Sequence, residues 1–156
     1  MHHYTRKEIL EMVEEEDVGF IRLQFTDIFG TMKNMAITVS QLRRALDNEC
    51  MFNAAAIDGF ADCGEETDFY LYPDLDTFEI FPWRPQQGKV ARLICDVYRP
   101  DGTPLPCDPR QVLKKVICEA EKMGYTLNVG PECEFFLFHL DDDGLPTTVT
   151  HEQGGY

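Results

Sequence analysis

The chain has 156 residues, and its 14 lysines and arginines stand against 28 aspartates and glutamates, for a net charge of −14. This balance argues against binding to nucleic acid or anionic lipid, which are themselves negatively charged. No apolar run approaches the roughly 20 residues of a membrane-spanning helix, and the first residues lack the apolar stretch of a secretion signal. Six cysteines without a Cys-x-x-Cys pair favour reduced thiols in a cytoplasmic protein.

The N-terminal part of the sequence predicts a helix followed by a hairpin. Thr5 and Glu8 have the spacing of a capping box, which places a helix within residues 1–15. Residues 19–26 alternate between apolar and polar side chains, as a half-buried strand does. After a short turn, residues 32–39 are expected to return as the second strand of the hairpin.

The next stretch is harder to interpret. Ser40 is expected to cap a second helix that ends near Asn48. Residues 51–67 show no clear period, so we predict a long loop, and long loops in compact domains are usually functional or disordered. Residues 69–81 are rich in aromatic side chains, but Pro73 is expected to interrupt them.

The pattern changes after the strand expected at residues 89–98. Asp108 and Pro109 have the residue types of an N-cap and a first helical position, and the helix that they begin ends before Gly124. A strand, a turn at residues 141–144 and a final short stretch follow. One helix and two strands are too few to close a sheet core, so we expect the chain to be a fragment of a longer polypeptide.

The most informative motif spans residues 130–138, GPECEFFLF. Its apolar run indicates a buried strand, and residues two apart on a strand point to the same face. Glu132 and Glu134 would then stand side by side, and divalent cations are the natural partners of two such carboxylates. The alternative is a strand whose first residues are still in water.

Several long strings of the sequence, in order and in register, resemble the N-terminal third of a bacterial type I glutamine synthetase of the Gram-positive kind. They are MFNAAAIDGF (51–60), FYLYPDLDTFEIFPW (69–83), GKVARLICDVYRPDGTPLPCDPR (88–110) and GPECEFFLF (130–138). The resemblance implies an α+β fold: residues 1–15 as an N-terminal helix, residues 16–100 as a β-grasp domain, and residues 105–156 as the start of a catalytic domain with an incomplete antiparallel sheet.

The resemblance also implies an activity, the ATP-dependent ligation of ammonia to L-glutamate through γ-glutamyl phosphate. In this family Mg²⁺ or Mn²⁺ neutralises charge on the phosphoryl oxygens, and Glu132 and Glu134 occupy the positions of two metal ligands. Most of the ATP site would lie beyond Tyr156, so the chain alone is expected to be inactive. Such proteins self-associate into stacked rings, and Phe78, Phe81 and Trp83 are candidates either to anchor a neighbouring subunit or to fill the domain's own core.

The sequence departs from the family at the loop that usually has the sequence MFDGSSIEGF. Asn53 stands where the family has an aspartate that binds ammonium and takes a proton from it. A neutral amide cannot attract the cation by charge and cannot act as a base. We therefore expect that this loop is impaired in ammonia activation. The protein would then be a homologue that uses another amine, a homologue that is not catalytic, or one whose sequence has been changed at this loop. The alternative is that water or a nearby carboxylate substitutes. An arginine near Asp62 that senses glutamine in Gram-positive relatives is also missing.

Overall fold

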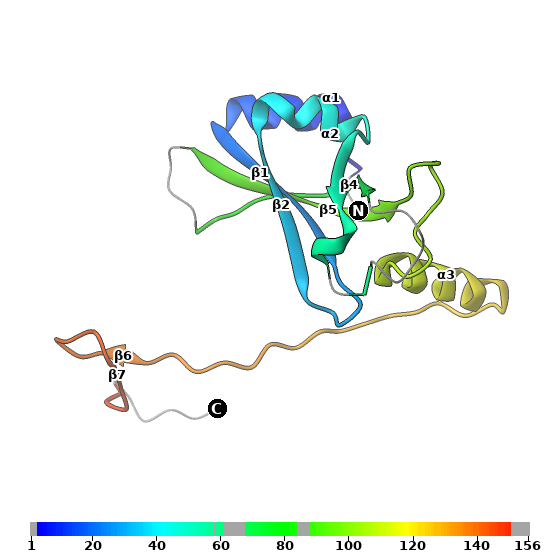
Figure 1. Ribbon diagram of the computed structural model, residues 1–156. Helices are drawn as coiled ribbons and strands as arrows, with labels where there is room; N and C mark the ends of the chain where they lie inside the picture. Colours follow the sequence, from blue (N-terminus) through cyan, green and yellow to red (C-terminus); the bar gives the residue numbers. More distant parts are fainter. Residues whose placement is uncertain (1–2, 58, 61–67, 84–87, 151–156) are drawn as a thin grey trace. The chain divides into compact units, whose positions relative to one another are not determined.

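The computed structural model describes residues 3–57, 59–60, 68–83 and 88–150 (Figure 1). The chain divides into two compact units, residues 1–126 and residues 127–156. The first unit contains α1 (Arg6–Glu15), β1 (Val18–Thr26), β2 (Met32–Thr38), η1 (Val39–Gln41), α2 (Leu42–Leu46), β3 (Cys50–Asn53), η2 (Ala54–Ala56), β4 (Asp68–Ile80), β5 (Lys89–Tyr98) and α3 (Pro109–Lys122). The domain limits inferred from the sequence stay a prediction.

Five strands of the first unit form one mixed sheet in the order β2-β1-β5-β4-β3. The central strand β5 runs parallel to its neighbour β1, and all other neighbouring strands are antiparallel. The predicted hairpin of β1 and β2 is confirmed, with Phe20 opposite Thr38 and Thr26 opposite Met32. The pairing between the strands farthest apart in sequence, β1 and β5, therefore lies inside the sheet. The edge strands β2 and β3 pair with strands that are close to them in sequence.

Two helices lie side by side over one face of the sheet (Figure 1). The predicted capping box of α1 is confirmed, because the Thr5 hydroxyl accepts a hydrogen bond from the Glu8 amide and the Glu8 carboxylate accepts one from the Thr5 amide. Side chains from both helices meet alternate side chains of β1 in a single core. Burying that apolar surface is the main force that holds the unit together.

Three expectations about residues 40–81 were wrong. Ser40 does not cap a helix: it lies in η1, its hydroxyl bonds Thr38, and α2 begins two residues later. The predicted loop begins instead with a strand, because β3 pairs with the start of β4. Pro73 does not interrupt β4, since pairing with β3 ends at Leu71 and β4 has a neighbour on only one side beyond it.

The helix α3 follows the sheet and is held by charged groups. Its N-cap Asp108, which is buried, accepts hydrogen bonds from the amides of Val97 on β5 and Arg110 on α3. The Arg110 guanidinium contacts Asp74 on β4 and Asp96 on β5. The predicted cap is thus confirmed, and the same residues tie the helix to two strands.

Three apolar side chains on one side of α3, Val112, Leu113 and Val116, are exposed. Cys107, which precedes the helix, is disulfide-bonded, so the expectation of reduced thiols was wrong at that position. No helix among residues 3–57, 59–60, 68–83 and 88–150 has the length and apolar character needed to cross a membrane.

Over residues 127–150, the part of the second unit that the structure describes, the only regular secondary structure is a two-stranded hairpin, β6 (His139–Leu140) and β7 (Pro146–Thr147). The acidic turn predicted between them is confirmed: a carboxylate oxygen of Asp141 accepts hydrogen bonds from the amides of Asp143 and Leu145. The buried strand expected at residues 130–138 was wrong, because this stretch has no regular secondary structure and is exposed. A strand needs a neighbour for its backbone groups, and the described part of this unit offers none there.

Candidate functional site

Asn53, the candidate for the ammonium position, lies at the end of β3, directly opposite Asp68 at the start of β4. Its side-chain oxygen accepts a hydrogen bond of 2.9 Å from the Ala55 amide, which makes Asn53 the N-cap of η2. Its side-chain nitrogen donates to Oδ1 of Asp68 over 3.1 Å. The two partners fix the orientation of the amide group, since one can only donate and the other can only accept.

The three alanines after Asn53 differ in their surroundings. Ala54 is fully buried in the core, whereas Ala55 and Ala56 are exposed. The residues that would carry hydroxyls in the usual loop sequence are therefore the two that face solvent. Their loss removes polar groups from the surface near Asn53 and leaves the core packing intact.

Phe60 anchors the far end of this segment. It is fully buried, and its ring lies 6.1 Å from that of Phe25, 6.4 Å from Phe52 and 6.5 Å from Phe69. These rings come from β1, β3 and β4, so the segment is tied to three strands at once. Aromatic clusters of this kind bury large areas and prefer tilted or edge-to-face contacts.

Gly59 lies against the tip of the β1–β2 hairpin. Its φ of +81° belongs to the left-handed region, and a Cβ built on it would lie 2.1 Å from Cδ1 of Ile28. Only glycine tolerates both the backbone conformation and so close an approach. The hairpin tip thereby limits where the Asn53 segment, residues 53–57 and 59–60, can lie.

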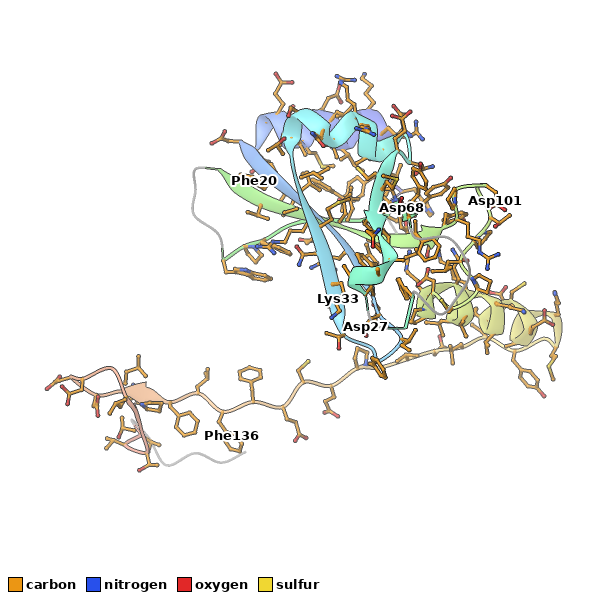
Figure 2. All side chains as sticks on the ribbon, viewed as in Figure 1. Phe20, Asp27, Lys33, Asp68, Asp101 and Phe136 are labelled. Carbon is orange, nitrogen blue, oxygen red and sulfur yellow. The ribbon has the colours of Figure 1, made fainter. Side chains whose placement is uncertain are left out.

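The hairpin tip is itself fixed by a buried carboxylate. Asp27 accepts hydrogen bonds from the amides of Phe29 and Thr31 and lies 3.3 Å from the Lys33 ammonium (Figure 2). Burial alone would raise the pKa of Asp27, but the two amides and Lys33 outweigh it and hold the pKa below the ordinary value. The tip that carries Ile28 is therefore a rigid turn.

Comparison with known proteins identifies the fold. Residues 17–100, more than half of the chain, match the family model "Glutamine synthetase, beta-Grasp domain", and residues 106–154 match "Glutamine synthetase, catalytic domain". This chain belongs to the glutamine synthetase family. The expected α+β fold, a β-grasp domain followed by the beginning of a catalytic domain, is confirmed.

Curated relatives agree with the family models. The chain is 63% identical over 156 residues to the glutamine synthetase of Clostridium saccharobutylicum and 56% identical over 154 residues to that of Staphylococcus aureus. These matches cover 100% and 98% of this chain but only 35% and 34% of the relatives. The chain thus spans about a third of the length of the curated relatives that it matches.

Solved structures support the fold at lower identity. A glutamine synthetase from Plasmodium falciparum matches 80% of this chain and 24% of its own, with a TM-score of 0.67 and 22% identity. A structure of GmaS without ligand matches 74% of this chain and 26% of its own, with a TM-score of 0.62 and 25% identity. At such identities the likeness concerns the fold.

The two candidate metal ligands, Glu132 and Glu134, do not form a metal centre in the described residues. Both side chains are exposed, in a stretch without regular structure. In the parts of the chain that the structure describes, no three histidine, cysteine, aspartate or glutamate side chains gather closely enough to hold a metal ion. The carboxylates are the donors that Mg²⁺ and Mn²⁺ prefer, but two of them do not make a complete ligand set.

Asp68 is the residue that sequence reasoning missed. The prediction of one long loop over residues 51–67 leaves no strand that would place Asn53 opposite a partner. The signal was present in the alternation of Cys50 to Asn53, a short strand that could pair with the aromatic stretch after residue 68. The glutamine-sensing position near Asp62 lies outside the described residues.

Proposed function

We propose that this chain forms the N-terminal part of an ATP-dependent glutamate–ammonia ligase. The observation that carries the proposal is the family match over both parts of the chain, together with 63% identity to the Clostridium saccharobutylicum enzyme. The substrates of the whole protein would be L-glutamate, ammonium and ATP, and its location would be the cytoplasm. The chain alone lacks most of a nucleotide site and is expected to be inactive.

Two carboxylates of the second unit would contribute to the metal centre of the whole protein. Glu132 and Glu134 would hold Mg²⁺ or Mn²⁺, which supplies neutralisation of phosphoryl charge when bound. Both side chains are accessible, which suits a site completed by other residues, phosphates and water. Within this chain their task is to present hard oxygen ligands two residues apart.

Assembly into rings is the second part of the proposal. Of the three aromatic candidates, Phe78 is buried in the core beside Tyr4, so it does not anchor a partner. Trp83 is 73% exposed, and its ring stacks on Phe81 at 4.7 Å. This stacked pair, in which Trp83 is exposed and Phe81 is half-buried, suits contact with another copy, since aromatic residues dominate many interfaces.

One observation favours a second function, ligation of an amine other than ammonium. The neutral Asn53 stands where the family uses an acid, and an amine that is uncharged at neutral pH depends less on that acid. A homologue that assembles without catalysis is the other alternative. These possibilities differ in which amine, if any, drives release of phosphate from ATP.

The test is a chimera in which residues 1–156 replace the matching third of the Clostridium saccharobutylicum relative. We expect phosphate release from ATP that depends on both glutamate and ammonium, and rings of the same size as the relative by light scattering. The relative itself and the 156-residue chain are the active and inactive controls. A chimera that assembles but turns over only with methylamine or hydroxylamine would favour the second function, and one that turns over with none would overturn the proposal.

A further inference from the structure

The candidate ammonium position lacks the charge that its ligand needs. Ammonium is a cation, and the Asn53 amide that stands in this position is neutral. An amide oxygen can accept a hydrogen bond from ammonium but cannot take its proton. If the site binds ammonium, then a negative charge has to come from a neighbouring side chain.

Asp68 is in place to provide that charge. Asp68, labelled in Figure 2, lies opposite Asn53 in the β3–β4 ladder. Its Oδ1 accepts a hydrogen bond from the Asn53 amide nitrogen. Its second oxygen has no hydrogen-bond or salt-bridge partner within the residues that the structure describes. The side chain is half-buried at the start of β4, so one oxygen is held while the other can take a ligand.

Three other carboxylates of this unit that are buried or half-buried are already committed to partners. Asp27 is closed in by two amides and Lys33, Asp74 is paired with Arg110, and Asp108 caps α3. No lysine or arginine in the described ranges neutralises Asp68. Its charge is therefore available, and the hydrogen bond from Asn53 holds it beside the amide.

We propose that Asp68 is the acid of the ammonium site, a catalytic residue that acts as a pair with Asn53; this proposal rests on the proposed function. Ammonium donates one hydrogen bond to Oδ1 of Asn53 and another to Oδ2 of Asp68. The Asp68 carboxylate then takes one proton from ammonium, which leaves neutral ammonia as the nucleophile and a protonated Asp68. That proton returns to solvent as the next cycle begins.

The pair also explains why asparagine is compatible with this position. An aspartate at residue 53 would place two carboxylates about 3.1 Å apart, where like charges oppose ionisation of both. One amide and one carboxylate keep a single negative charge and a hydrogen bond between them. A variant with aspartate at residue 53 and asparagine at residue 68 should therefore keep both the single negative charge and the hydrogen bond.

The decisive experiment measures ammonium kinetics in the chimera for three variants. Asp68→Asn keeps an oxygen that can accept from Asn53 and removes only the charge; we expect the ammonium KM to rise about 10- to 100-fold, as for loss of a charged hydrogen bond. The KM values for glutamate and ATP should stay unchanged. The exchange Asn53→Asp with Asp68→Asn should recover most of the ammonium affinity.

Asp101→Asn is the matched control, because it makes the same change at an exposed turn carboxylate whose partner is Thr103 (Figure 2). Thermal unfolding of each variant shows that the variants are folded. An active chimera in which Asp68→Asn leaves the ammonium KM unchanged would overturn the assignment of Asp68 alone. A folded, assembled chimera without any ammonium-dependent turnover would overturn the proposed function together with it.

Discussion

The Asn53 segment and the stretch at residues 130–138 contrast within one chain. Both carry candidate site residues, and both contain phenylalanines. In the first, Phe60 is fully buried among rings from three strands. In the second, Phe136 is 87% exposed and the two glutamates are in water.

The difference lies in what each segment has for neighbours. The Asn53 segment pairs with β4 through Asn53, lies against the hairpin tip through Gly59 and buries Phe60, so it has packing partners inside the same unit. The second stretch has, in its described unit, only a two-stranded hairpin beside it in sequence. A motif shows which chemistry a segment can perform, but neighbouring elements decide whether its geometry is formed.

The largest expected effect compares the two phenylalanines directly. Phe60→Ala should lower the free energy of unfolding by about 3 to 5 kcal/mol, because it removes a ring from a packed cluster and leaves a cavity. Phe136→Ala should change it by less than about 0.5 kcal/mol, since the exposed ring has little packing to lose. Urea denaturation of the two variants measures both values, and equal losses would contradict the contrast.

A second prediction concerns the contact between the hairpin tip and the Asn53 segment. Gly59→Ala should destabilise the chain by about 2 to 3 kcal/mol, from a strained positive φ and from a clash with Ile28. In an Ile28→Ala background, the same substitution should destabilise by only about 1 to 2 kcal/mol, because only the backbone strain remains.

The measurement is a double-mutant cycle by urea denaturation, with Phe29→Ala as the matched background. Phe29 is on the same turn and 74% exposed, so its loss should leave the effect of Gly59→Ala unchanged. Effects of equal size in all three backgrounds would show that Ile28 does not confine Gly59.

A smaller, pH-dependent effect is expected at Asp27, whose pKa in the folded state lies below its ordinary value of 3.8. Its charge therefore stabilises the fold above pH 4 or so, and this contribution is lost as the pH falls through the lowered pKa. Asp27→Asn keeps an acceptor for the turn amides but loses the attraction to Lys33. The variant should be less stable than the parent at pH 7, and the difference should shrink at pH 3.

Urea denaturation at the two pH values checks this prediction. Asp143→Asn, which removes an exposed carboxylate from the turn of the second unit, is the control and should change the stability by less than about 0.5 kcal/mol at pH 7. A stability difference for Asp27→Asn that is the same at pH 7 and pH 3 would mean that the turn depends on its hydrogen bonds alone.

The smallest expected effect is at the two exposed glutamates. The 156-residue chain should bind Mn²⁺ only weakly, with a Kd in the millimolar range or above, because two carboxylates leave most of the coordination to water. Calorimetric titration should give the same result for the Glu132→Gln, Glu134→Gln double variant. Saturable micromolar binding that the double variant loses would mean that the second unit forms a metal centre by itself.

Local signals in the sequence were sufficient for several elements. The Thr5–Glu8 capping box, the Asp108 N-cap with Pro109, and the apolar run of β5 each depend on residues close together in sequence, and each element formed where expected. Such elements are specified by hydrogen bonds and side-chain periodicity within one turn or one strand.

Most of the failures involve partners distant in sequence. The strand β3 is too short to show a period and exists because β4 pairs with it. Pro73 lies in a strand because β4 has only one neighbour there, which no local rule could show. Asp68 was missed for the same reason, since its relation to Asn53 is a pairing across fifteen positions. Residues 130–138 have the apolar run of a buried strand, but the described part of their unit has no strand that pairs with them.

The parallel pairing of β1 with β5 has a consequence for the order of events during synthesis. Val18 pairs with Lys89, so the centre of the sheet closes only after some 70 further residues have left the ribosome, a wait of about 4 to 15 s at typical elongation rates. Until then the β1–β2 hairpin has an open inner edge, which is a template for pairing with other chains. Nascent chains that pause before β5 is made are therefore the ones most exposed to aggregation.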